Sequence, residues 1–214
     1  MIKIKVSIIG PRTITRTCEF ARIKQDNLMR LIDGVGRVLA KHGFEIVIIP
    51  NAGVSYLVSK TYKAHKGKKV IGLMPKNPEP FGIEHQKLHL DIVDEIKELP
   101  DWYHVAGRLV IESDFTICIG LSGGTMMTLC WAKWYSTCLN QERKIVIFEN
   151  TISRRLHPEL EAIIRAVYVN SIDELDYLID STFWLSPMDF VRSLQLQFER
   201  NKEYRDLKMV KKRK

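Results

Sequence analysis

Cysteine is scarce in this 214-residue sequence, with four residues at positions 18, 118, 130 and 138. No two of them form a Cys-x-x-Cys pair, so neither a zinc site nor a thioredoxin-type redox pair is indicated. Cys118 lies inside an apolar run, and we expect it to act as a small buried hydrophobic residue. The cysteine pattern therefore predicts reduced thiols in a cytoplasmic protein.

Long apolar runs are also absent. No run approaches the roughly 20 residues that a transmembrane helix needs, and the segment Met1–Lys5 is not followed by the apolar stretch of a signal peptide. We therefore expect no membrane partner and no leader. The sequence contains 45% hydrophobic and 27% charged residues. This proportion of apolar side chains is sufficient to form a buried core, and it excludes wholesale disorder.

Basic residues exceed acidic ones, but unevenly. The formal net charge is +8, and the segment 199–214 alone contains eight basic and three acidic residues. Most of the excess therefore belongs to this tail, and the body has no basic stripe with interleaved aromatic residues. A nucleic-acid partner, if there is one, is expected to bind through residues 199–214.

Short apolar runs alternate with segments of helical periodicity along most of the chain. The residues of these runs are nearly all apolar, which is typical of parallel strands buried on both faces. The expected strands are 4–10, 44–49, 69–74, a short one within 92–99, 115–120, 144–148 and 166–169. The expected helices are 28–41, 51–65, 101–112, 124–139, 158–165, 171–179 and a further one from 186 to about 198.

This alternation predicts an α/β fold, a doubly wound and mostly parallel Rossmann-like sheet with helices on both faces. We expect residues 1–182 to form a nucleotide-binding domain, and residues 183–214 to form a C-terminal helix with a basic tail.

Three strand ends carry residues suited to ligand binding, which in such sheets occurs at the carboxyl ends of strands. A glycine-rich turn that opens a helix presents free amides and the positive end of the helix dipole, an arrangement that favours phosphate. We expect Asn51 to cap the helix that follows it. The candidate ligand-binding residues are Arg12 and Thr13 after the first strand, Asn51 and Gly53 after the second, and Gly120, Ser122, Gly123, Gly124 and Thr125 after the strand 115–120.

The strand, the Gly-Gly-Thr turn and the helix, with the lead-in Glu112-Ser113-Asp114, resemble the SLOG superfamily. Its members include the LONELY GUY phosphoribohydrolases, formerly called lysine-decarboxylase-like, and molybdenum-cofactor carrier-like proteins. The resemblance covers about residues 3–179. It implies a Rossmann-like sheet, a nucleotide phosphate on the glycine turn, and a homodimer.

The sequence departs from the family motif Pro-Gly-Gly-x-Gly-Thr-x-x-Glu. In the register of Gly124-Thr125, the first three positions are Gly120, Leu121 and Ser122, and Thr128 stands where the family has its catalytic Glu. A threonine has no proton that titrates near neutral pH, so it does not replace a carboxylate in acid–base catalysis. The family's upstream Arg is also displaced, with Arg108 nearby.

Three functions compete. The first is a nucleotide- or ribose-phosphate-binding protein without phosphoribohydrolase activity. The second is an active hydrolase of an N-glycosidic bond, with Arg108 as charge stabiliser and Glu112 or Glu149 as the carboxylate. The third is a nucleic-acid-binding protein that uses the tail. We favour the first, with no resident cofactor and no metal, and interpret His85 and His89 as exposed loop histidines. Trp134 and Tyr135 are candidates for core packing, a partner surface or a nucleobase platform.

Overall fold

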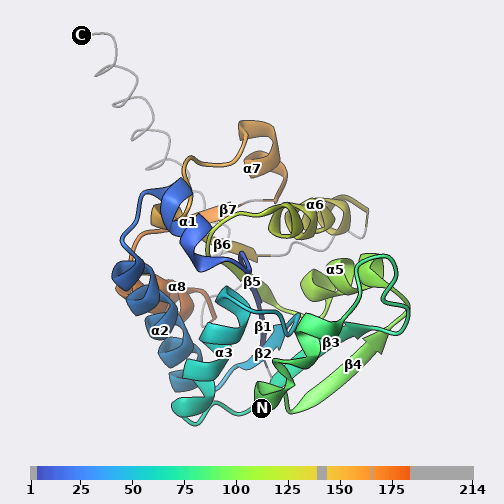
Figure 1. Cartoon of the computed structure of the whole chain (residues 1–214). Coiled ribbons are helices and arrows are strands. Elements are labelled where there is room, and N and C mark those ends of the chain that lie inside the picture. The colour runs from blue at the N-terminus through green and yellow to red at the C-terminus, as the bar shows by residue number, and fades with distance from the viewer. Residues whose placement is uncertain (1–3, 139–143, 165, 184–214) are drawn as a thin grey trace, which may run out of the picture. The chain divides into compact units, whose positions relative to one another are not determined.

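A computed structural model describes residues 4–138, 144–164 and 166–183 of the protein. These residues form a seven-stranded sheet in which every pairing is parallel. The strands are β1 (Lys5–Ile9), β2 (Glu45–Ile48), β3 (Val70–Pro75), β4 (Glu95–Leu99), β5 (Phe115–Cys118), β6 (Lys144–Phe148) and β7 (Ala166–Val169). Their order is β4-β3-β2-β1-β5-β6-β7, so the chain winds outward from β1 in one direction and then from β5 in the other (Figure 1).

Helices cover both faces of the sheet. Those of the first half, α2 and α3, lie on one face, and α5 and α6 lie on the other (Figure 1). The helices are α1 (Ile14–Ala21), α2 (Gln25–Lys41), α3 (Val54–Ala64), α4 (Glu84–Lys87), α5 (Trp102–Ile111), α6 (Gly123–Cys138), α7 (Pro158–Ile164) and α8 (Ile172–Phe183), with 3₁₀ turns η1 (Leu90–Ile92) and η2 (Glu149–Thr151). The predicted doubly wound, Rossmann-like α/β fold is confirmed. No helix among the described residues has both the length and the apolar character to cross a membrane.

The chain divides into two compact units, Met1–Ile172 and Asp173–Lys214. The first holds the entire sheet, and the second begins within α8. The helix expected at 186–198 and the basic tail lie outside the described residues, and the expected boundary at residue 182 stays a prediction.

The central strands form because most of their side chains are apolar and covered on both faces, whereas the edge strand β4 has three charged residues among its five. All residues of β2, β3 and β5 are buried, and the core between the sheet, α5 and α6 includes Leu73, Leu109 and Leu129. Cys118 is fully buried, and this burial raises the pKa of its thiol to about 12. The expectation that Cys118 serves as a small core residue is thereby confirmed.

Two local predictions need correction. The polar run after β1 was not expected to be helical, yet α1 begins at Ile14 and buries Thr17. Asn51 does not cap α3, because that helix begins at Val54 after Gly53. Gly53 has φ 80° and ψ −135°, a conformation essentially restricted to glycine, and this turn postpones the start of the helix by two residues.

A chain of buried hydroxyl groups links β1, β5 and the end of α5. The Ser7 and Thr116 hydroxyl oxygens are 2.6 Å apart, and the Ser113 hydroxyl donates to Ser7 Oγ at 3.1 Å. We expect Ser7→Ala to lower the free energy of unfolding by about 1–3 kcal/mol, since it leaves Thr116 without its partner. The double variant Ser7→Ala/Thr116→Val should cost less than the sum of the two single changes. Urea denaturation measures both quantities, and strict additivity would contradict the coupling.

Candidate ligand-binding site

The sheet has one topological switch point, between β1 and β5. After β1 the chain continues to β2 on one side, and β5 occupies the other side, so the loops that leave the two strands diverge and leave a crevice. A cavity of about 580 Å³ lies there, lined by residues of the turns after β1, β2 and β5. This volume is in the range of small-molecule sites.

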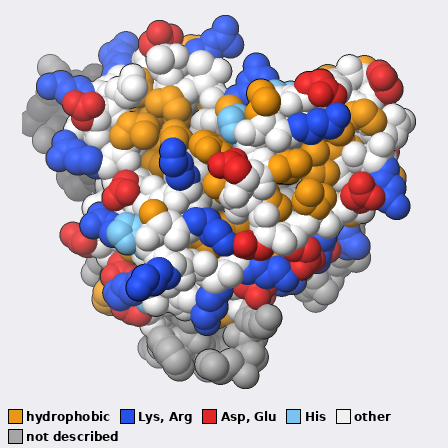
Figure 2. Space-filling view, turned by 60° about the horizontal axis from the view of Figure 1, so that its bottom comes forward, with side chains coloured by type: hydrophobic (Ala, Val, Ile, Leu, Met, Phe, Trp, Pro, Cys, Tyr) orange, Lys and Arg blue, Asp and Glu red, His pale blue; other side chains and the backbone are white. Residues whose placement is uncertain are grey.

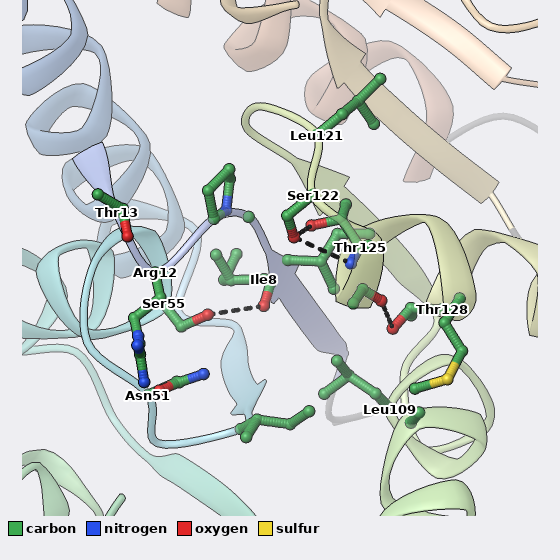
Figure 3. A pocket seen from close by; sticks show the side chains of 18 of the residues that line it. Ile8, Arg12, Thr13, Asn51, Ser55, Leu109, Leu121, Ser122, Thr125 and Thr128 are labelled. Carbon is green, nitrogen blue, oxygen red and sulfur yellow. Dashed lines mark hydrogen bonds between the residues drawn. The ribbon is translucent and has the colours of Figure 1, made fainter. Parts of the chain in front are cut away.

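The turn from β5 into α6 forms one wall of the cavity (Figure 3). The Ser122 hydroxyl accepts a hydrogen bond from the Thr125 amide at 3.2 Å and lies 2.9 Å from Thr125 Oγ1. Ser122 is thus the N-cap of the helix, while the amides of Gly123 and Gly124 belong to the first turn and have no intrahelical acceptor. Both glycines line the cavity, and a Cβ built on either would meet no atom within 4 Å.

Gly120 has a different role from the two glycines that follow it. Its amide donates to Thr151 Oγ1 at 2.8 Å, and it does not line the cavity. A Cβ there would lie 2.8 Å from Thr17 Cγ2 and 3.0 Å from Pro11 Cδ. Gly120 therefore lets the turn pack closely against the chain that follows β1, and it is a structural residue of the site.

The loop after β1 supplies the positive charge. Arg12, Thr13 and Arg16 line the cavity, and both arginines are exposed. Among the described residues that line the cavity there is no Asp and no Glu. The combination of two guanidinium groups, the start of α6 and no carboxylate makes the cavity electrostatically favourable for an anion.

The turn after β2 brings Asn51 to the cavity but not Gly53. Gly53 instead supports the loop after β1: its Cα is so close to this loop that a Cβ would lie 2.3 Å from the Arg12 carbonyl oxygen. The next amide, of Val54, donates to the Pro11 carbonyl oxygen at 3.2 Å. Arg12 and Asn51 lie on one side of the cavity, across from Ser122 and Thr125 (Figure 3).

Several residues of the cavity were not found by sequence reasoning. Phe20, Phe81 and Trp102 provide aromatic surface, and Gln86 provides a polar group on α4. His85, which we expected to be an exposed loop histidine, is half-buried in α4 and also lines the cavity, so that expectation is wrong. Their sequence surroundings carry no motif: Phe81 follows a proline-rich loop, and α4 has only four residues. The Trp102 indole N–H donates to the Pro78 carbonyl oxygen at 3.0 Å, which holds this loop to α5.

Trp134 and Tyr135 do not line the cavity. Trp134 is exposed, and Tyr135 packs near Trp131 with ring centroids 6.3 Å apart. His89 is also not a lining residue, and its ring centroid lies 4.5 Å from that of Tyr56. The aromatic surface available to a ligand therefore comes from other residues than those that the sequence suggested.

The candidate catalytic residues lie outside the cavity. Glu112 ends α5, where its carboxylate accepts a hydrogen bond from Lys97 Nζ at 2.7 Å and lies 3.8 Å from Arg108 Nε. Burial raises the pKa of Glu112, but the hydrogen bond from Lys97 and the charges of Lys97 and Arg108 outweigh it, and the pKa falls below its ordinary value. Arg108 and Glu112 thus take part in a structural ion-pair cluster.

Glu149 is also held elsewhere. Its two carboxylate oxygens accept hydrogen bonds from Arg155 Nε at 2.7 Å and Nη2 at 2.6 Å. The Arg155 guanidinium lies 4.5 Å from the centre of the Tyr168 ring. At the position of the family's catalytic Glu, Thr128 does line the cavity, and its hydroxyl donates to the Gly124 carbonyl oxygen at 3.2 Å.

On the face shown in Figure 2, lysine and arginine side chains are interspersed with acidic ones and do not gather into a continuous stripe. This arrangement agrees with the charge pattern of the sequence body, in which the basic excess is small.

Comparison with known proteins supports the fold. No protein-family model matches the sequence, and no curated protein gives a significant match. Among solved structures, the chain is similar to the molybdenum cofactor carrier protein of Chlamydomonas reinhardtii (16% identity over 84% of this chain and 97% of the other, TM-score 0.59). It is similar to the molybdenum cofactor binding protein of Rippkaea orientalis (17%, 85% and 98%, TM-score 0.59).

A third similar structure is the DNA processing protein A of Helicobacter pylori, described by its single-stranded DNA binding mode (19% identity, 82% of this chain and 80% of the other, TM-score 0.55). At these identities the likeness concerns the fold alone. The Rossmann-like fold that the resemblance implied is therefore confirmed.

Proposed function

We propose that the protein binds a phosphorylated small molecule, a nucleoside phosphate or ribose phosphate, in the cavity between β1 and β5. The observation that carries the proposal is the set of charges around the cavity: two arginines and the start of α6, with no Asp or Glu among the described lining residues. In this proposal the phosphate accepts hydrogen bonds from the amides of Gly123 and Gly124 and from nearby hydroxyl groups. The positive charges of Arg12 and Arg16 at the cavity favour the entry of this anion.

We further propose that the protein does not cleave the N-glycosidic bond as phosphoribohydrolases do. Such cleavage needs a carboxylate next to the bond and a group that stabilises developing charge. The position that corresponds to the catalytic Glu is Thr128. The two carboxylates offered as replacements, Glu112 and Glu149, are engaged in ion pairs away from the cavity.

The similar structures named for a bound cofactor support a ligand-binding role over a purely structural one. The alternative of nucleic-acid binding depends on residues 199–214, which lie outside the described residues, and it stays a prediction.

Titration calorimetry with ribose 5-phosphate, ribose and AMP tests the proposal. We expect ribose 5-phosphate and AMP to bind and ribose to bind far more weakly. AMP incubated with the protein should release no adenine, measured by chromatography. Failure of every phosphorylated compound to bind would overturn the binding proposal, and release of free adenine in proportion to protein concentration would overturn the proposed lack of hydrolase activity.

A further inference from the structure

Two side-chain carboxamides that line the cavity each have an oxygen atom without a hydrogen-bond partner among the described residues. Gln86 is 2% exposed, and its Nε2 lies 2.6 Å from His85 Nε2, while its Oε1 is buried without a partner in the described part of the chain. Asn51 Oδ1 is likewise buried and unpartnered within the described residues. Both residues line the cavity.

The contact between Gln86 and His85 is compatible with either orientation of the amide, because His85 Nε2 can accept from the amide nitrogen or donate to the amide oxygen. Burial, together with the charges of Arg12 and His89, lowers the pKa of His85. The lowered pKa favours the neutral ring, which has one donor and one acceptor nitrogen.

A buried polar atom without a hydrogen bond is unfavourable, so a partner for these amides is favoured. The described part of the chain does not supply one, and both side chains line the cavity. Because both unpartnered atoms are amide oxygens, a complementary partner is a group with N–H donors, such as the amino or ring N–H edge of a heterocycle.

The strand order places the carboxamides away from the turn proposed for the phosphate. Asn51 follows β2 and Gln86 follows β3, whereas Ser122 follows β5, on the other side of β1. β2 and β5 are separated by two strand spacings, about 10 Å. A nucleoside monophosphate has a comparable length from its phosphate to the edge of its base.

We propose that Asn51 and Gln86 form a recognition subsite for the hydrogen-bonding edge of a nitrogen heterocycle. The ligand is then a phosphorylated heterocycle, such as a nucleotide, and a sugar phosphate occupies only part of the site. The proposal rests on the proposed function, because the phosphate end of the same ligand binds at α6. Asn51 and Gln86 are positioned to give selectivity, and the glycine turn gives affinity for phosphate.

The test compares ribose 5-phosphate with AMP, GMP, CMP and UMP by calorimetry. We expect the wild-type protein to bind at least one nucleotide about tenfold or more tightly than ribose 5-phosphate. Gln86→Met, which keeps the length of the side chain and removes its polar atoms, should abolish this difference and leave the affinity for ribose 5-phosphate unchanged. Asn51→Ala, on a different element, should act in the same direction and serves if Gln86→Met does not fold.

Ser59→Ala is the matched control, because Ser59 Oγ is also buried without a partner among the described residues but does not line the cavity. It should change neither affinity. Equal affinity of the wild-type protein for ribose 5-phosphate and all four nucleotides would overturn the subsite and leave the proposed function standing. A preference for a nucleotide over ribose 5-phosphate that persists in both Gln86→Met and Asn51→Ala would have the same meaning. Absence of binding by ribose 5-phosphate and all nucleotides would overturn the proposed function and the subsite with it.

Discussion

Gly124→Ala is expected to weaken the binding of phosphorylated ligands by about 10- to 100-fold, the equivalent of one hydrogen bond to a charged group. A Cβ at Gly124 meets no protein atom within 4 Å, so the fold has room for it. The methyl group instead occupies the space in which we propose that the phosphate approaches the amides. Calorimetry with ribose 5-phosphate measures the loss.

Although Gly124→Ala should bind phosphorylated ligands more weakly, its stability without ligand should not fall. Alanine is more favourable than glycine in a helix by up to about 1 kcal/mol, so the melting temperature without ligand should stay the same or rise. Gly123→Ala should behave similarly, since its surroundings are equally open. Cys130→Ala, at an exposed position further along α6, is the control that should bind normally. Unchanged affinity in both glycine variants would remove the glycine turn from the proposed site.

Gly53→Ala is expected to destabilise the protein by about 3 kcal/mol, which lowers the melting temperature by about 6–12 °C. The added Cβ would lie 2.3 Å from the Arg12 carbonyl oxygen and 2.4 Å from that of Pro11. Both are backbone atoms of the loop after β1, so relief requires the loop to move. Differential scanning calorimetry measures the change, and the same movement should also weaken ligand binding through Arg12.

Gly82→Ala helps to distinguish the two causes of the destabilisation at Gly53, which are the positive backbone φ and the contact with the loop after β1. Gly82 has φ 70° and nothing within 4 Å of a built Cβ, so its substitution carries only the cost of a left-handed backbone conformation, about 1–2 kcal/mol. We expect Gly53→Ala to be the more destabilising of the two by a clear margin. Equal effects would mean that contact with the loop after β1 contributes nothing.

Most of the sheet was predictable from the sequence because its central strands are largely apolar on both faces. Runs such as 44–49 and 115–120 have no polar face, and a run that is apolar on both faces belongs in a covered parallel sheet. The short strand around 92–99 was also predictable, as β4. The helix α1 was not, since its first turn is polar and it buries a threonine where periodicity arguments look for an apolar side chain.

The candidate site was predictable only in part. The turns after β1, β2 and β5 were identified correctly as strand ends, and the fold brings residues of all three to one cavity. The separate roles of the glycines could not be predicted, because one residue type fills two structural roles. At Gly53 and Gly120 a side chain would collide with neighbouring atoms, whereas the space beside Gly123 and Gly124 is open. Gln86 was missed because a four-residue helix after a proline-rich loop shows no periodicity.

The central claim, that a phosphate binds at the start of α6, is tested most directly by NMR of protein labelled with ¹⁵N only in glycine. The sequence has twelve glycines, and Gly123→Ala and Gly124→Ala assign the two signals of interest. On titration with ribose 5-phosphate, we predict that these two amide signals move together and saturate, while the signals of glycines remote from the cavity, such as Gly43 and Gly67, stay in place. Saturable binding that leaves the Gly123 and Gly124 signals unmoved would contradict the account.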